Sequence, residues 1–153
     1  MTILRSMLLA IATVVVLSGC GTMNSVVPPS TDLEFNVAKD VNPDPNGRPS
    51  PVVVRVLELN SRSVFDSQDF FALYDNPEAA LGEDLLSKDE LVLEPGEEKS
   101  YEMRLDRKTR FIAVMAAYRD LEHSRWRDVV VADPEGYDSF DVKIGKLSIS
   151  IKD

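Results

Sequence analysis

Few residues of this 153-residue chain have side chains suited to catalysis or metal binding. It contains one cysteine, Cys20, and one histidine, His123. A single cysteine allows neither an internal disulfide nor a zinc site built from several cysteines and histidines. A Ser-His-Asp triad would have to use His123, which lies in a polar stretch where a lone histidine is usually just exposed. The carboxylates are spread singly along turns and solvent faces, so no acid–base pair stands out. The sequence therefore predicts neither an enzyme nor a bound metal or cofactor.

Cys20 lies where a different reaction, lipid attachment, is available. Residues 7–17 (MLLAIATVVVL) are mostly apolar and follow a short segment with one positive charge, Arg5. As a helix this run would rise about 16 Å, roughly half a bilayer core, which suits the apolar part of a signal peptide rather than a membrane span. The small residues Ser18 and Gly19 then precede the cysteine. This pattern resembles the bacterial lipobox, in which the cysteine thiol receives a diacylglyceryl group and the amine freed by cleavage is acylated in turn.

We therefore expect residues 1–19 to be a lipoprotein signal peptide and Cys20 to carry the lipid. The alternative is an ordinary secretory signal that happens to end near a cysteine. Several acyl chains would anchor the protein stably, whereas a single chain binds a membrane only marginally. Gly21 stands where enterobacterial lipoproteins kept at the inner membrane have Asp. We therefore expect a lipid-anchored protein of the outer membrane that faces the periplasm.

The composition after this segment is that of a globular domain with an acidic surface. Apolar residues make up 44% of the chain and charged residues 28%. Removal of residues 1–19 leaves 16 basic and 26 acidic residues, a net charge of −10. Such a surface repels phosphates, so no nucleic-acid partner is expected. Residues 20–31 are small, polar and proline-bearing and predict a flexible tether, which leaves residues 32–153 for one folded domain.

Apolar residues recur with the period of β-strands through most of this domain. In the first expected strand Leu33, Phe35 and Val37 alternate with more polar residues. Further strands are expected at residues 52–59, 101–105, 110–118, 127–132 and 140–151. We expect a bulge at Gly145 to keep the apolar residues of the last strand on one face. The basic cluster 107–110 falls between two expected strands and is interpreted as a hairpin turn.

A helical insertion is expected after the second strand. Asp66 is a candidate N-cap, with Phe65 and Phe70 placed to form a hydrophobic staple. Residues 76–77 (Asn-Pro) predict the start of a second short helix, which Gly82 would end. Short strands with turn signals and one small helical insertion predict an all-β protein, a two-sheet β-sandwich.

The segment 42–51 (NPDPNGRPSP) between the first two strands has an unusual composition. It contains four of the nine prolines of the chain. Proline fixes φ, and the pair Asn46-Gly47 favours a tight turn, so this loop is expected to be stiff. A stiff exposed loop loses little conformational entropy on binding, which makes it a candidate binding site. The alternative is a rigid connector between the two sheets.

Several segments taken together resemble a known protein family. They are the lipobox cysteine, NPDPNGRPSPVVVRVLEL at 42–59, FFALYD at 70–75, LEPGEEK at 93–99 and AAYRDLEHSRWR at 116–127. Their order and spacing are similar to those of the outer-membrane lipoprotein of the type VI secretion system, the TssJ (SciN-like) family. The resemblance covers nearly the whole mature chain.

The resemblance implies a transthyretin-like β-sandwich with an added helical element. It also implies that the lipoprotein, anchored through Cys20, binds the periplasmic C-terminal part of the inner-membrane protein TssM and so contacts TssL indirectly. In the family the loop between the first two strands is a principal contact. The corresponding candidate residues here are Asn42, Pro43, Asp44, Pro45, Asn46, Gly47, Arg48 and Pro49. We expect Asp44, Asn46, Gly47 and Arg48 at the loop tip, with Arg48 best suited to a charged pair with the partner.

Two other functions remain as alternatives. One is a periplasmic hydrolase, because relatives of the transthyretin fold hydrolyse hydroxyisourate; those enzymes use several histidines, and this chain has one. The other is a lipoprotein that binds a small ligand or a cell-wall fragment between sheet and helix. That function would require an apolar pocket with converging polar groups, which is a feature of tertiary structure.

Overall fold

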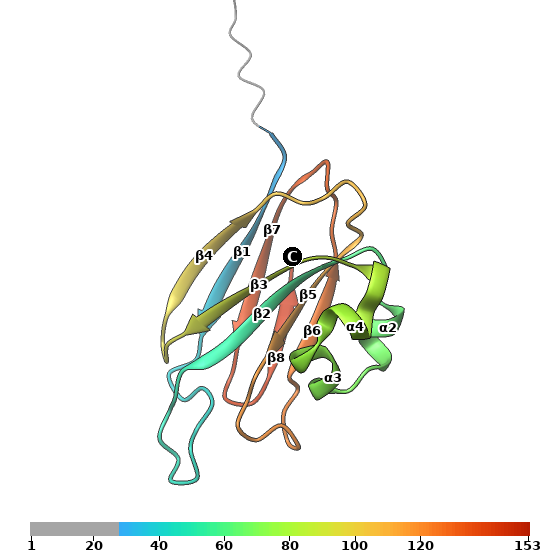
Figure 1. Ribbon diagram of the computed structural model, residues 1–153. Helices are drawn as coiled ribbons and strands as arrows, with labels where there is room; N and C mark the ends of the chain where they lie inside the picture. Colours follow the sequence, from blue (N-terminus) through green and yellow to red (C-terminus); the bar gives the residue numbers. More distant parts are fainter. Residues whose placement is uncertain (1–27) are drawn as a thin grey trace, which may run out of the picture.

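The computed structural model describes residues 28–153, which form two four-stranded sheets packed face to face (Figure 1). The strands are β1 (Ser30–Val37), β2 (Val52–Leu59), β3 (Leu85–Leu93), β4 (Glu98–Met103), β5 (Phe111–Ala116), β6 (Arg127–Val131), β7 (Tyr137–Ile144) and β8 (Ile149–Lys152). The helices are α2 (Ser63–Ser67), α3 (Phe70–Asp75), α4 (Pro77–Leu81) and the 3-10 helix η1 (Gly82–Asp84). All of the helices lie between β2 and β3, so the predicted β-sandwich with a helical insertion after the second strand is confirmed.

Sheet A has the strand order β4-β1-β7-β8 and sheet B the order β3-β2-β5-β6. The central strand β1 pairs antiparallel with β4 and parallel with β7, while the remaining pairs are antiparallel. The strand begins at Ser30, so it includes two residues at the end of the segment expected to be a tether. Thr31 is 1% exposed and pairs with Met103 of β4, so this polar residue is part of the sheet and not of the tether.

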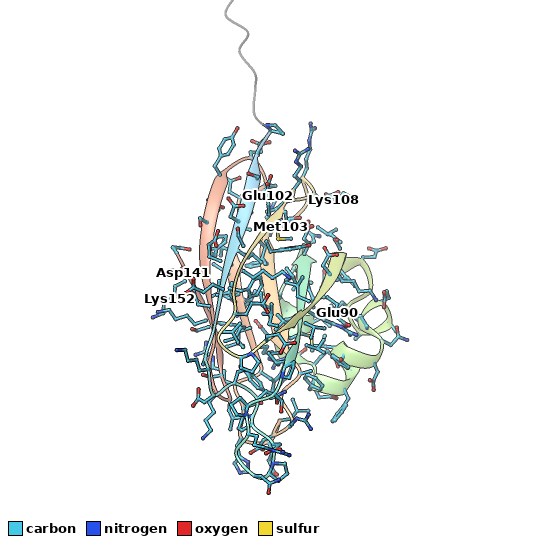
Figure 2. The ribbon with its side chains drawn as sticks, turned by 90° about the vertical axis from the view of Figure 1, so that its left-hand side faces the viewer. Glu90, Glu102, Met103, Lys108, Asp141 and Lys152 are labelled. Carbon is cyan, nitrogen blue, oxygen red and sulfur yellow. The ribbon has the colours of Figure 1, made fainter. Side chains whose placement is uncertain are left out.

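The main core lies between the sheets and is lined by the inward residues of both. Leu33 and Phe35 of β1 are buried there together with Val54 and Val56 of β2. Figure 2 shows the two layers from the side, with Met103 pointing between them and Asp141 and Lys152 on the outer side of sheet A. That outer side is polar along β1, β4 and β7, as expected of a sheet with one solvated face.

A second core lies on the outer side of sheet B, beneath the helices. It contains Leu57 and Leu59 of β2 and Ala113 and Met115 of β5, packed against apolar residues of the insertion. The members from the helices are Phe65, Phe70, Leu73 and Leu81. Strands β2 and β5 are therefore buried on both faces, which is why they are nearly continuous apolar runs in the sequence.

Two arginines of sheet B hold the insertion in place. The Arg127 guanidinium donates to three backbone carbonyls at the end of α2, those of Phe65 (2.6 Å), Asp66 (2.7 Å) and Gln68 (2.7 Å). Arg55 donates to the carbonyl of Tyr74 at the end of α3 and lies 4.0 Å from the centre of its ring. Cations at helix C-termini satisfy carbonyls that have no partner within the helix.

The predicted bulge at Gly145 is wrong, because the segment 140–151 is a hairpin. Strands β7 and β8 pair antiparallel, and the Gly145 N–H donates to the Ser148 carbonyl at 2.7 Å to close the turn. A Cβ at Gly145 would lie 3.0 Å from Ser148 Oγ and 3.2 Å from the Ser148 carbonyl oxygen, so a larger residue would require Ser148 to shift. Alternation of apolar residues continues in both arms of a hairpin, and the period therefore does not distinguish a hairpin from one bulged strand.

The segment 107–110 is a crossover between the sheets rather than the predicted hairpin turn, because β4 belongs to sheet A and β5 to sheet B. Its position is set by Glu58, which is 6% exposed. The Glu58 carboxylate accepts hydrogen bonds from the Thr109 hydroxyl (2.9 Å) and the Asp106 N–H (3.1 Å). One buried carboxylate thus fastens the crossover over the end of the core.

The predicted N-cap of the helical insertion is also different. Asp69, rather than Asp66, caps α3 by accepting from the Ala72 N–H at 3.0 Å. Asp66 lies within α2, where it pairs with Arg62 one turn earlier. The prediction for residues 76–77 and Gly82 is confirmed: Asn76 caps α4, Pro77 is its first residue, and Gly82 follows with φ +55°.

Strand β3 was not predicted from the sequence. It is the edge strand of sheet B, and its middle residues Ser87, Lys88, Asp89 and Glu90 are exposed. Charged residues on an edge strand prevent pairing with other chains, but they also remove the alternation by which a strand is detected.

We expect Glu58→Ala to lower the free energy of unfolding by about 1–3 kcal/mol, because the buried Thr109 hydroxyl and Asp106 N–H lose their acceptor. Urea denaturation followed by circular dichroism measures the change. Glu102→Ala, on the exposed outer face of β4, is the matched control and should alter stability by no more than about 0.5 kcal/mol. Equal effects of the two substitutions would show that Glu58 does not hold the crossover.

Candidate functional site

Four connections gather at the end of the sandwich opposite the start of β1 (Figure 1). They are the β1–β2 loop (38–51), the β3–β4 turn (94–97), the β5–β6 loop (117–126) and the β7–β8 turn (145–148). We call this the loop end. The eight residues of β1 separate it from the start of the strand by about 25 Å. In Figure 1 the β1–β2 loop projects beyond the other three connections.

Asn42 joins three of these connections. Its backbone has φ +47°, a conformation that asparagine tolerates better than most residues, and the residue is 3% exposed. The side-chain amide donates to the Pro51 carbonyl at 2.8 Å, and its oxygen accepts from the Arg119 N–H at 2.8 Å. The Asn42 N–H donates to the Lys146 carbonyl at 3.0 Å. One buried residue therefore closes the base of the β1–β2 loop and attaches it to the β5–β6 loop and the β7–β8 turn.

The exposed part of the loop is folded around the Asp44 carboxylate. One oxygen accepts from the backbone N–H groups of Asn46 (2.8 Å) and Arg48 (3.0 Å), and the other pairs with the Arg48 guanidinium at 2.7 Å. The hydrogen bond from the Arg48 N–H is the main cause that holds the pKa of Asp44 below its usual value, with smaller contributions from the Arg48 guanidinium, Asn46 and Arg119. The loop is therefore crosslinked internally, in agreement with the stiffness predicted from its prolines.

Tyr118, which follows β5, connects the β5–β6 loop to the β7–β8 turn. Its ring is buried, and its hydroxyl donates toward the carbonyls of Gly145 (3.1 Å) and Ser148 (2.8 Å), so it ties the end of β5 to the β7–β8 turn. Burial raises the pKa of the Tyr118 phenol well above its usual value, so it remains a hydrogen-bond donor in ordinary buffers.

A groove of about 530 Å³ lies between the three joined connections. Its walls are residues 43–47 of the β1–β2 loop, Arg119 and Asp120 of the β5–β6 loop, and residues 146–147 of the β7–β8 turn. The last two segments are far from the loop in the sequence, so sequence reasoning did not place them beside it. The only signal was that Arg119 and Asp120 belong to one of the segments that carry the family resemblance.

The predicted contact residues fall into two groups in the structure. Pro45, Asn46, Gly47, Arg48 and Pro49 are exposed at the loop tip. Pro43 and Asp44 are partly buried, and Asn42 is buried with its side chain already hydrogen-bonded, so its place is structural. Arg48 forms its ion pair within the loop. Binding by these residues stays a prediction, and Cys20 lies outside the described residues.

His123 lies on the surface near this groove and pairs with Asp120, with 2.8 Å between Nδ1 and Oδ1. This hydrogen bond is the main cause that lowers the pKa of Asp120 below its usual value. Within residues 28–153 no group of three or more His, Cys, Asp or Glu side chains is arranged to hold a metal ion. No helix in the same part of the chain is long and apolar enough to cross a bilayer.

We expect Asn42→Gly to loosen the loop end although glycine adopts φ +47° without strain, because both side-chain hydrogen bonds are lost. The free energy of unfolding should fall by about 2 kcal/mol, and the Arg119 amide should exchange its hydrogen faster. Asn42→Asp retains the acceptor for Arg119 and should protect that amide better than Asn42→Gly does. Unchanged exchange at Arg119 in both variants would contradict the role given to Asn42.

The family comparison and the solved structures indicate the same protein family. Residues 29–147 match the family described as type VI secretion lipoprotein, VasD, EvfM, TssJ, VC_A0113. The crystal structure of the type VI secretion lipoprotein TssJ1 from Pseudomonas aeruginosa has 36% identity and a TM-score of 0.78, covering 82% of this chain and 95% of that one. No curated protein matches the sequence at a comparable level.

Two further solved structures share the fold. Serratia marcescens Lip, described as a membrane bound component of the type VI secretion system, has 27% identity and a TM-score of 0.75, over 83% of this chain and 98% of that one. A chain in a structure described as the TssM C-terminal domain from EAEC has 24% identity and a TM-score of 0.70, over 81% of this chain and 98% of that one. At that identity the second likeness shows the fold alone.

The matched family is one of secretion lipoproteins and not a family of enzymes. The match extends from the residue before β1 into the β7–β8 turn, so it includes strands β1 to β7, the helical insertion and the groove-lining residues of the loop end. The chain belongs to the type VI secretion lipoprotein family, that of TssJ.

Proposed function

We propose that this protein is the outer-membrane anchor of a type VI secretion membrane complex. In this proposal residues 1–19 are removed as a signal peptide, lipid on Cys20 holds the protein at the periplasmic face of the outer membrane, and the loop end binds the periplasmic C-terminal region of TssM. TssL is reached only through TssM.

The observation that carries the proposal is the opposite placement of the chain entry and the loop end. The segment that leads from Cys20 enters the sandwich at Ser30, and ten residues of tether reach at most about 35 Å. The β1–β2 loop lies about 25 Å further along β1. A protein held by lipid at one end thus presents the loop away from the membrane, where a partner from the inner membrane approaches.

The internal crosslinks of the loop also support a binding role. The hydrogen bonds to Asp44 and Asn42 already hold residues 42–51 in one conformation. A partner therefore orders few side chains when it binds, which lowers the entropic cost of association. Membership of the TssJ family, whose lipoproteins the resemblance pairs with TssM, makes TssM the first partner to test.

We expect replacement of residues 43–49 by a Gly/Ser segment of equal length to abolish binding to the TssM C-terminal region. Asn42 is retained, because it closes the base of the loop. The full-length protein in detergent is titrated with the TssM region by calorimetry, and circular dichroism checks the fold. The control replaces residues 133–136, in the turn between β6 and β7 at the other end, and should bind normally. Binding that survives the loop replacement would move the interface elsewhere.

We expect Cys20→Ser to release the protein from the membrane fraction, because no thiol remains to receive the lipid. Metabolic labelling with an alkyne-bearing fatty acid, followed by fractionation, measures both attachment and location. A second variant, Gly21→Asp, should keep the label but move the protein toward the inner membrane in an enterobacterial host. A labelled Cys20→Ser protein in the outer membrane would overturn the anchor assignment.

A further inference from the structure

We infer that the groove at the loop end binds an acidic segment of the protein partner, with Arg119 and Lys146 as the cations that receive its carboxylates. The inference rests on the proposed function and specifies the chemistry of the same interface. It adds two residues that lie outside the β1–β2 loop.

The acidic side chains of the groove have ion-pair partners within the protein, whereas its basic side chains have none among the described residues. The Asp44 carboxylate is already bound by Arg48 and two backbone N–H groups, and the Asp120 carboxylate by His123. Arg119 and Lys146 are both exposed, and neither has a carboxylate of the described chain within ion-pair distance. The acidic groups of the groove therefore have their partners within the protein, whereas the cations keep donors available for an external carboxylate.

The positions of both cations are held by the backbone. The Arg119 N–H donates to the Asn42 side chain, and the Lys146 carbonyl accepts from the Asn42 N–H. Tyr118 holds the turn that carries Lys146 by its hydrogen bond to Ser148. The backbone positions that carry the two cations are thus fixed relative to each other before a partner arrives, which lowers the entropic cost of binding.

The negative charge of the rest of the protein helps to steer an acidic segment toward the groove. The chain carries a net charge of −9, so an acidic segment is repelled by most of the surface. The groove walls carry Arg119 and Lys146 together with the carboxylates of Asp44 and Asp120, and Asp44 is already neutralised by its ion pair with Arg48. An approaching acidic segment is therefore steered to this end of the molecule, and the register of the complex is set there.

A second groove, of about 550 Å³, is lined by the ends of β1 and β7 together with Gly96 and Glu98. Its two lysines, Lys39 and Lys143, are accompanied by Glu98 and Asp141 in the same walls. Unlike Asp44 and Asp120, these two carboxylates have no ion-pair partner within residues 28–153, so both remain to repel an acidic segment. The choice between the grooves thus follows from their charges rather than their sizes.

Charge reversal tests the inference directly. The full-length protein carrying Arg119→Glu and Lys146→Glu together should bind the TssM C-terminal region at least about tenfold more weakly, mainly through slower association, and with less dependence on salt. The matched control carries Arg104→Glu and Lys108→Glu, two exposed cations near the end where β1 starts, the second of which is labelled in Figure 2. This control should bind like the unmodified protein. Thermal unfolding verifies that all variants are folded.

Carbodiimide coupling tests whether Lys146 contacts a carboxylate of the partner directly, which a purely structural role of Lys146 would not require. The reagent joins a lysine amine to a carboxylate in direct contact, so Lys146 should become linked to an aspartate or glutamate of the TssM region, as identified by mass spectrometry. Lys108 should not be linked. Lys146→Arg retains the charge without the amine, and should keep the binding while losing the crosslink.

The possible results separate the inference from the function on which it rests. Weaker binding by the groove variant alone, with a Lys146 crosslink, supports both. Normal binding by the groove variant, or equal losses in the groove variant and the control, overturns the inference and leaves TssM as the partner. A failure of the unmodified protein to bind the TssM region overturns the proposed function and the inference with it.

Discussion

The arrangement of the loop end depends on the hydrogen bonds of one buried residue, Asn42. Three connections from different parts of the chain meet there, and this residue bonds to all of them through Pro51, Arg119 and Lys146. An aliphatic residue of similar size would leave the Arg119 N–H and the Pro51 carbonyl without partners and would be strained at φ +47°. The stiff loop, the groove and the placement of its cations all follow from this junction.

The helical side of the molecule is organised by burial on both faces of sheet B. Strands β2 and β5 contribute to the core between the sheets and to the core beneath the helices. Arg55 and Arg127 then close the ends of α3 and α2 with hydrogen bonds to backbone carbonyls. Rigid packing of this kind keeps the sandwich from deforming, so the start of β1 and the loop end remain at a fixed separation. Such rigidity suits the proposed anchor, because it would keep the span between the membrane contact and the partner contact constant.

Much of this fold was predictable because local signals agree with it. Strand β2 was predicted with its observed bounds, and the cap at Asn76 follows from residue types alone. The failures have a common cause. The hairpin at Gly145, the crossover at 107–110, the cap at Asp69 and the edge strand β3 each depend on which segment lies next to which. Alternation of apolar residues does not specify which strands pair, so a hairpin and a bulged strand have the same sequence pattern.

The sequence by itself determined the class of protein: an all-β domain with a lipobox-like N-terminus and a proline-rich loop, in the order typical of one family. Only the tertiary structure decided what the loop end consists of. Arg119 and Lys146 are separated from the loop by about seventy to a hundred residues of sequence, and they reach it because β5 and β7 both run toward the same end of the sandwich. The structure also showed that Arg48 is already paired while those two cations are not. Charge pairing depends on distances in space, and these are set only when the two sheets have packed.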